Sequence, residues 1–162
     1  MTFDHLQKLV AMMFLPDGTG GTSQRYTGVD VKTLNPLVAA YVGDAYFSLF
    51  VRGRLLSYEQ SKVQVLNQFG AQIVSAVWQA RAYRDIEDLL TPEEQAVYRR
   101  GRNAKSHAPR KATVAEYHMS TGFEAVLGTL YLTEEYERLY EVAEASFQSI
   151  ARQMMAEMKN KK

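Results

Sequence analysis

The chain has 162 residues, the size of one ordinary domain, and 46% of them are hydrophobic, which is enough for a substantial core. Its formal net charge of +1 excludes a general polycation, so any affinity for nucleic acid must come from a local basic patch. The absence of cysteine excludes disulfides and thiolate zinc sites, and it fits a reducing cytoplasm. We recognise no signal peptide, and no apolar stretch reaches the roughly 18 residues that span a bilayer.

The N-terminal part of the chain reads as an extension in front of the main domain. Residues 3–15 predict a short amphipathic helix, and the Gly- and Thr-rich segment 16–23 predicts a loop or linker. We therefore expect a partly flexible extension over residues 1–28 and one domain over residues 29–162.

The first half of that domain reads as helical. Asn35-Pro36 has the form of an N-cap followed by proline at the first helical position. It opens a helix to about Leu56 that is hydrophobic nearly all round, as expected of a central buried helix. Apolar residues at three- and four-residue spacing predict a second helix over residues 58–82, followed by a short one over 86–90.

The second half of the domain reads in the same way. An N-cap, a proline and two acids over residues 91–94 start a helix to about Arg100. Residues 101–111 are expected to form a loop. Thr113 opens a further helix to about Leu132, and a last helix starts after that, with a polar tail expected to fray beyond Arg152. Period-two alternation is scarce, so we predict an all-α fold.

Two acidic residues stand alone in apolar segments. Asp44 is the only acid within residues 32–57, and Glu124 is the only acid within residues 118–131. A lone carboxylate in a buried apolar helix is costly unless it is paired, protonated or bound to a cation. Small residues flank both acids and would let two helices approach closely. Two carboxylates that meet between helices are a natural site for Mg²⁺ or Mn²⁺.

The alternative is that each acid is structural and bonds to a helix N-terminus or to a basic residue such as Arg52 or Arg54. Repetition of the same pattern favours the metal site. His118 lies six residues before Glu124 and hence on a different helix face, so we expect a surface or core histidine rather than a ligand. We find no nucleophile with a convincing histidine partner, no P-loop and no dinucleotide fingerprint.

A basic run over residues 99–111 is the second feature. It holds six Lys or Arg residues and no acid, and Gly101 and Pro109 interrupt it, so we predict a loop rather than a helix face. Cations with amide and hydroxyl groups suit a phosphate backbone, although a merely solvated loop is the alternative. The residues expected to contact RNA are Arg99, Arg100, Arg102, Asn103, Lys105, Ser106, Arg110 and Lys111.

The two acidic segments resemble motifs of the ribonuclease III family. Tyr-Val-Gly-Asp-Ala over residues 41–45 resembles the family's signature helix, which carries a catalytic aspartate. Phe-Glu-Ala-Val-Leu-Gly over residues 123–128 resembles its second acidic motif, which carries a metal-binding glutamate. Arg-Gly-Arg-Asn-Ala-Lys-Ser over 100–106, Ser-Thr-Gly-Phe-Glu-Ala over 120–125 and the expected lack of a double-stranded RNA-binding domain resemble the Mini-III group. The resemblance covers about residues 31–150.

The resemblance implies an all-α, dimeric ribonuclease III endonuclease domain that cleaves double-stranded RNA with Mg²⁺, with Mn²⁺ as a substitute. Asp44 and Glu124 would be its catalytic metal ligands. Ala40, Leu37 and Thr121 stand where the full-length enzymes carry further acids, so only two clear carboxylate ligands remain.

The resemblance further implies a cytoplasmic homodimer that matures the 23S ribosomal RNA precursor. Partners consistent with that role are a large-subunit ribosomal protein or the pre-ribosome. One competing interpretation is a catalytically silent RNA-binding module of the same fold that acts in ribosome assembly, but a degenerate copy would lose its acids first. Another is a helical structural protein with salt-bridged acids, which would not respond to Mg²⁺.

Overall fold

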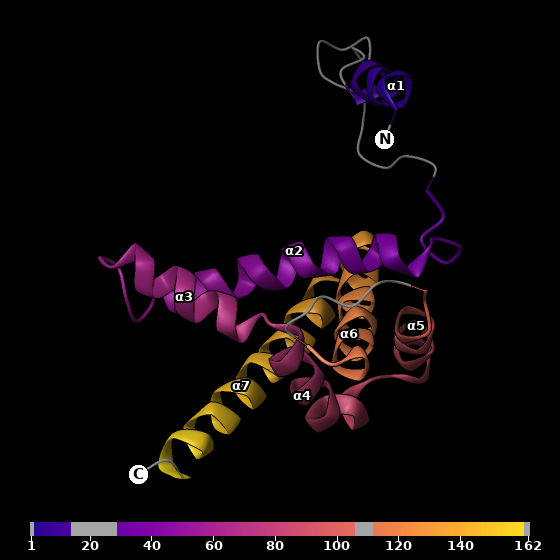
Figure 1. Ribbon diagram of the computed structural model, residues 1–162. Helices are drawn as coiled ribbons and strands as arrows, with labels where there is room; N and C mark the ends of the chain where they lie inside the picture. The colour runs from indigo at the N-terminus through magenta and orange to yellow at the C-terminus, as the bar shows by residue number, and fades with distance from the viewer. Residues whose placement is uncertain (1, 14–28, 106–111, 161–162) are drawn as a thin grey trace. The chain divides into compact units, whose positions relative to one another are not determined.

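The computed structural model describes residues 2–13, 29–105 and 112–160 (Figure 1). These residues contain helices and no strand, which confirms the all-α prediction. In chain order the elements are α1 (Phe3–Met13), α2 (Pro36–Leu55), α3 (Val63–Ile73), α4 (Ala76–Ile86), the 3₁₀ helix η1 (Glu87–Leu89), α5 (Pro92–Arg102), α6 (Val114–Leu132) and α7 (Tyr136–Asn160). Within the described ranges, none of the helices is long and apolar enough to cross a bilayer.

The chain divides into two units, residues 1–30 and residues 31–162. The first unit contains α1, which leaves apolar side chains such as Phe3 and Val10 exposed. The predicted linker over residues 16–23 lies outside the described residues. The second unit contains α2 to α7.

The helix ends follow the capping residues that the sequence predicts. Asn35 accepts a hydrogen bond from the backbone N–H of Leu37 at 2.9 Å, and Pro36 follows it as the first residue of α2. Thr91 and Thr113 begin α5 and α6 with full capping boxes, in which the threonine and the glutamate three residues later each bond the other's backbone N–H.

Helices α2 and α6 cross in direct backbone contact, and two glycines make this possible. A Cβ atom at Gly43 would lie 1.9 Å from the carbonyl oxygen of Glu124. A Cβ atom at Gly128 would lie 1.8 Å from the carbonyl oxygen of Ala39. No other amino acid fits at either position without separating the helices, because real Cβ contacts are far longer.

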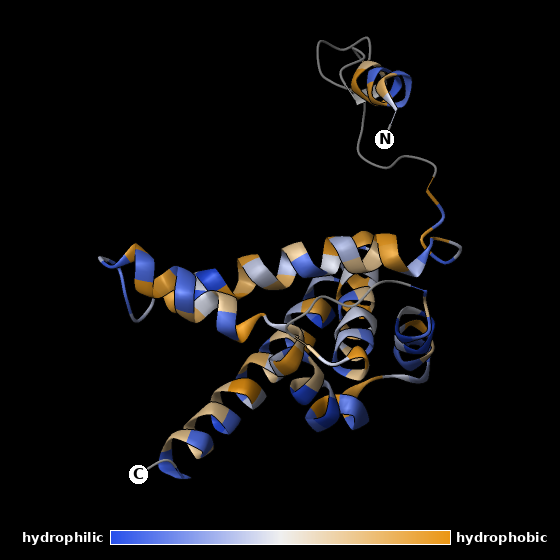
Figure 2. Cartoon of the chain, viewed as in Figure 1, coloured by the Kyte–Doolittle hydropathy of each residue, from blue (hydrophilic) through white to orange (hydrophobic). Residues whose placement is uncertain are grey.

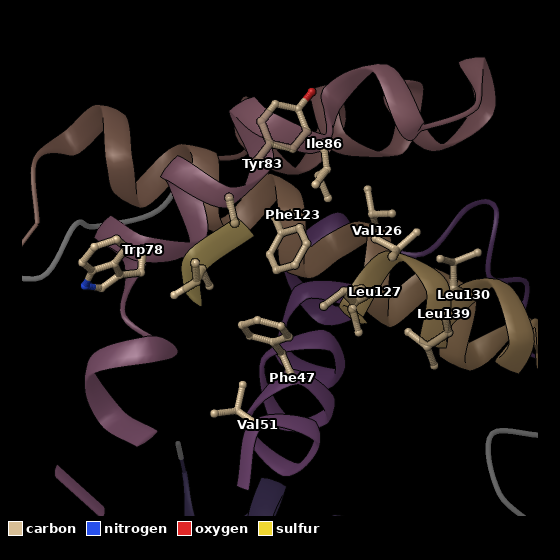
Figure 3. Close-up of a cluster of buried hydrophobic side chains, with 14 of the residues drawn as sticks. Phe47, Val51, Trp78, Tyr83, Ile86, Phe123, Val126, Leu127, Leu130 and Leu139 are labelled. Carbon is tan, nitrogen blue, oxygen red and sulfur yellow. The ribbon is translucent and has the colours of Figure 1, made fainter. Parts of the chain in front are cut away.

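The hydrophobic core lies beside this crossing (Figure 3) and includes buried side chains from each of the helices α2 to α7. Phe47 of α2 and Phe123 of α6 are fully buried and pack edge to face, with ring centroids 5.3 Å apart. Trp78 of α4, Tyr98 of α5 and Leu139 of α7 complete the cluster from the other sides. Asp44 and Glu124 are thus carried by two helices that both contribute fully buried side chains to the core.

The prediction that α2 is buried on all sides is wrong. Its buried positions follow one face, which consists of Ala39, Ala40, Gly43, Phe47, Val51 and Leu55. On the opposite face Val38 is 48%, Tyr41 79% and Leu49 69% exposed. Hydrophobic and polar stretches alternate along α2 in Figure 2. The hydrophobic pattern of the sequence is the same for a helix that is buried on all sides and for a helix that leaves one apolar face exposed, so it could not distinguish the two.

The predicted helix over residues 58–82 is two helices. Glu59 accepts hydrogen bonds from the backbone N–H groups of Ser61 and Lys62, a local turn that delays the start of α3 to Val63. A second break follows at Ser75, whose extended backbone (ψ 151°) ends one helix and starts the next. The apolar spacing continues across the break and hides it from a periodicity argument.

Two further boundaries differ from the prediction. Helix α5 continues through Gly101 to Arg102, because Gly101 packs against α6, where a Cβ atom would lie 2.8 Å from that of Ala125. Helix α7 continues to Asn160 instead of fraying beyond Arg152. An ion pair between Glu157 and Arg81 of α4 holds this last part of α7 against the domain.

Candidate active site

Asp44 of α2 and Glu124 of α6 meet where these two helices cross, at the close backbone contact that Gly43 and Gly128 allow. Gly43, the residue before Asp44, lies against the backbone carbonyl of Glu124 itself. The Asp44 side chain is exposed, whereas that of Glu124 is partly buried. The helix packing therefore brings together two acids that are 80 positions apart in the sequence, one at the surface and one beneath it.

The two carboxyl groups influence each other electrostatically. The pKa of Glu124 is raised to about 8, first by burial and then by the negative charge of Asp44, while a hydrogen-bond interaction with Gln79 lowers it in part. Partial desolvation also raises the pKa of Asp44. Such a pair is unfavourable as two free carboxylates and becomes favourable when a cation binds between them.

The interpretation of these acids as salt-bridged structural residues finds no support. In residues 29–105 and 112–160, the ion pairs do not include Asp44 or Glu124. Arg54, an expected partner, pairs with Glu144 and donates to the hydroxyl of Tyr140 at 2.8 Å. The two carboxyl groups are therefore available to a ligand.

A divalent cation fits the residues that are present. Carboxylate oxygens are the ligands that Mg²⁺ prefers, and one or two of them commonly suffice because the ion keeps several waters. Among the described residues no group of three or more His, Asp or Glu side chains could hold a metal. The site thus offers two protein carboxylates and leaves the remaining coordination positions to water and substrate.

The three positions at which the family resemblance leads us to expect further acids do not supply additional ligands. Ala40 and Leu37 have no oxygen in their side chains. Thr121 is 3% exposed, and its hydroxyl donates to the backbone carbonyl of Tyr117 at 2.9 Å. Its hydroxyl is used within its own helix.

The basic run is only partly the loop that the sequence predicts. Arg99, Arg100 and Arg102 belong to the last turn of α5. Arg100 is tied into the fold, because its guanidinium donates to the backbone carbonyl of Lys32 at 2.8 Å. The prediction failed because glycine usually breaks a helix, whereas Gly101 serves here to let α5 approach α6 closely.

Some of the predicted RNA-contacting residues gather around one hollow. A surface pocket of about 660 Å³ is lined by Arg102, Asn103 and Lys105 and, from α6, by His118. Arg99 and Arg100 do not line this pocket, and Ser106, Arg110 and Lys111 lie outside the described residues. The pocket joins cations and an amide, a combination that suits a phosphate group.

Two further residues lie near these sites. His118, which the sequence predicts to be a surface or core histidine, lines this pocket, and its buried Nδ1 has no hydrogen-bond partner in the described part of the chain. Gln79 is absent from the predicted site, although it acts on Glu124. The feature that could have drawn attention to Gln79 is its amide side chain, which stands at a position where the apolar spacing of α4 predicts a hydrophobic residue.

Comparison with known proteins agrees with this arrangement. Residues 37–135 match the family model described as "Ribonuclease III domain". The chain is 48% identical to Mini-ribonuclease 3 of Symbiobacterium thermophilum over 121 residues, which are 74% of this chain and 93% of the relative. It is 44% identical to Mini-ribonuclease 3 of Enterococcus faecalis over 116 residues, 70% of this chain and 88% of the relative.

A solved structure agrees as well. The crystal structure of a Fusobacterium nucleatum protein superposes with a TM-score of 0.66 at 28% identity, covering 74% of this chain and 96% of that one. The chain therefore belongs to the ribonuclease III family. Within it the chain falls in the Mini-ribonuclease III group, as the sequence motifs indicate, and it is an endoribonuclease.

Proposed function

We propose that this endoribonuclease hydrolyses phosphodiester bonds of double-stranded RNA, with Asp44 and Glu124 holding Mg²⁺, or Mn²⁺ in its place. The observation that carries the proposal is the meeting of two otherwise isolated acids at a helix crossing. No cationic side chain of the described residues pairs with either acid.

Each acid has a distinct part in this proposal. Asp44 is exposed and can hold a cation where a nucleic acid reaches it. Glu124 is partly buried, so its carboxyl is restrained and must lose its proton before it can bind a cation at neutral pH. A bound Mg²⁺ would supply an activated water and would polarise the scissile phosphate.

The basic residues serve to bind the RNA in this proposal. Arg102, Asn103 and Lys105 line one pocket and would contact phosphates. Double-stranded RNA has a major groove too deep and narrow for side chains to read, so recognition depends mostly on shape and backbone. Further contacts are proposed for the other basic and polar residues of the run, namely Arg99, Arg100, Ser106, Arg110 and Lys111.

A homodimer is part of the proposal. Cutting both strands of one duplex takes two sites that face it, which a two-fold dimer provides. The exposed apolar stripe Val38, Tyr41, Ala45 and Leu49 follows the three- and four-residue spacing of one face of α2 and suits a self-complementary contact. Sedimentation that shows an active monomer at working concentration would refute the dimer.

The proposed cellular substrate is the 23S ribosomal RNA precursor, in the cytoplasm, with a large-subunit ribosomal protein or the pre-ribosome as a further partner. This part rests on the likeness to the Mini-ribonuclease III group. It is tested by the ends of the 23S RNA in cells that lack the protein, which we expect to remain unprocessed.

The direct test of the activity is incubation of the protein with a long RNA duplex, read on a gel. We expect cleavage with Mg²⁺ and none with a chelator, while the separated strands alone remain largely intact. A protein that binds the duplex but does not cut it in Mg²⁺ or Mn²⁺ would be the silent RNA-binding module instead. Cleavage unaffected by the chelator would contradict the metal site.

A further inference from the structure

Arg84 of α4 lies far from the basic run in the sequence but beside the pocket that this run forms. Helices α4 and α5 both pack against α6 (Figure 1). Arg84 is exposed, and its Nη2 donates a weak hydrogen bond to the Sδ of Met119 on α6 at 3.6 Å. Met119 lines the same pocket as Arg102 and Lys105. Arg84 therefore brings a cation from a third helix to the edge of this pocket.

The contact on α6 leaves the charge of Arg84 unneutralised. In the part of the chain that the structure describes, Arg54, Arg81 and Arg138 each pair with a glutamate of another helix. Arg84 belongs to none of the ion pairs found there, and the atom it contacts is a neutral sulfur. A guanidinium has five N–H donors, and the bond to Met119 uses one of them. Most of the hydrogen-bonding capacity of Arg84 is thus available to an anion.

The acids that lie near Arg84 are held by other partners. Hydrogen bonds from Thr113 are the main cause that lowers the pKa of Glu116, and the charge of Arg84 adds least. The carboxylate of Glu116 accepts the backbone N–H of Thr113 at 2.9 Å as part of the capping box of α6. Glu87 accepts the hydroxyl of Tyr83 at 3.1 Å. These acids therefore do not account for the position of Arg84.

The positive charges of Arg84 and Arg102 come together near Tyr98. Burial raises the pKa of the Tyr98 hydroxyl to about 12, and the charges of Arg102 and Arg84 both act against this shift. Both guanidinium groups consequently lie close enough to influence one hydroxyl group. Like charges held near each other repel, and an anion bound beside them removes this cost. Arginine also matches the oxygen atoms of a phosphate with two parallel hydrogen bonds.

We propose that Arg84 is a further RNA-binding residue, which holds a backbone phosphate next to the phosphate bound by Arg102 and Lys105. The inference rests on the proposed function, because it takes the pocket as the place where the RNA duplex docks. An A-form duplex offers phosphates in regular succession along each strand, so neighbouring cations can each contact one. The RNA-binding surface then extends from the basic run onto α4, where the sequence pattern singles out no RNA-binding residue.

The test adds Arg84→Gln to the Asp44→Asn background and measures binding of a synthetic RNA duplex over a salt series. We expect the slope of log affinity against log salt concentration to fall by about 0.9, taking the B-DNA value as a guide. Arg84→Lys keeps the positive charge and should keep most of the slope. Both variants should retain the circular dichroism spectrum of the parent, because the side chain is exposed.

Arg152→Gln in the same background is the matched control. Arg152 is exposed and does not line the pocket, so its replacement should leave the slope close to that of the parent. An Arg84→Gln slope that equals the parent's, or that falls no further than with Arg152→Gln, would overturn the role of Arg84 alone. Failure of the wild type to cut the duplex in Mg²⁺, or of the Asp44→Asn parent to bind it, would overturn the proposed function as well.

Discussion

Two regions of the molecule share helix α6 but are built in different ways. One is the acid site, formed by Asp44 and Glu124, and the other is the basic pocket, which is lined by Arg102, Asn103 and Lys105 together with His118 of α6. At the acid site, backbone lies against backbone, and Gly43 and Gly128 leave no room for a Cβ atom. At the basic pocket, Arg102 and Lys105 are exposed side chains around an open hollow. A cation site depends on oxygen atoms held in place, whereas attraction to phosphates acts over several ångströms and tolerates motion. We therefore expect abrupt losses from changes at the first site and graded losses at the second.

The largest loss of activity is expected when either acid of the acid site is replaced. Asp44→Asn and Glu124→Gln should each abolish cleavage of an RNA duplex, because each removes a proposed cation ligand while keeping the side-chain shape. Circular dichroism and duplex binding should remain close to wild type, since the helices and the basic pocket are unchanged. Near-normal turnover of either variant in Mg²⁺ would show that the residue is not a required ligand.

The glycine crossing can be tested through stability. Gly128→Ala places a Cβ atom where the structure allows 1.8 Å to a carbonyl oxygen, so the helices must separate. We expect a loss of about 3 kcal/mol or more in the free energy of unfolding, measured in urea, or a failure to fold.

The chain offers a matched control for that change. Gly53 lies in α2, and a Cβ atom added there would have no neighbouring atom within 4 Å. Gly53→Ala should therefore stabilise the protein by about 0.5–1 kcal/mol, because alanine is the better helix former. Equal effects of the two substitutions would show that the crossing is not close-packed in solution.

Graded losses of RNA binding are expected when cations of the basic run over residues 99–111 are removed. Neutralising Arg102, Lys105 and Lys111 together in an Asp44→Asn background should weaken duplex binding and flatten its dependence on salt. Each lost phosphate contact should reduce the log–log slope by about 0.9, taking the B-DNA value as a guide. Binding would be measured over a salt series. Mn²⁺ affinity of the triple variant in the wild-type background should change little, because the carboxylates are untouched.

A charge-matched control separates the pocket from net charge. Neutralising three exposed cations that do not line the pocket, Lys62, Arg152 and Lys159, should leave most of the salt dependence in place. A slope that falls equally in both sets of variants would mean that the RNA does not dock at the pocket.

A further expected effect concerns the stability of the metal-free protein and its dependence on pH. The pKa of Glu124 is raised from 4.5 to about 8 in the folded chain, so the folded state holds a proton that the unfolded state releases between these values. Wild-type stability should therefore fall as pH rises through this window, whereas Glu124→Gln lacks this loss.

In a chelating buffer at pH 9 we expect Glu124→Gln to be more stable than wild type by at least about 1 kcal/mol, or roughly 2–4 °C in Tm. At pH 4.5 the two proteins should melt at similar temperatures. A variant that is less stable than wild type at both pH values would show that burial does not penalise this carboxylate.

The sequence predicts those parts of the structure that local rules control. The caps at Asn35, Thr91 and Thr113 depend on neighbouring residues, so these helix starts were predictable. The acids Asp44 and Glu124 stand out because their apolar surroundings are visible in the sequence. The family motifs and the all-α fold follow from the same stretches.

The parts that the sequence did not predict depend on packing between distant segments. Gly101 reads as a helix breaker, and only its contact with α6 explains why α5 continues through it. Ser75 interrupts an apolar pattern that runs on across the break. The meeting of Asp44 with Glu124 depends on the crossing of α2 and α6, whose relative orientation no local pattern encodes.

The close packing of α6 has a consequence for how the protein loses activity on heating. Glycine contacts fix this helix on two sides, against α2 at Gly128 and against α5 at Gly101, and most of its middle is buried. Its backbone amides should exchange with solvent only when the whole domain opens. The acid site consequently has no looser local state in which it is lost first, and thermal inactivation should coincide with the cooperative unfolding of the domain.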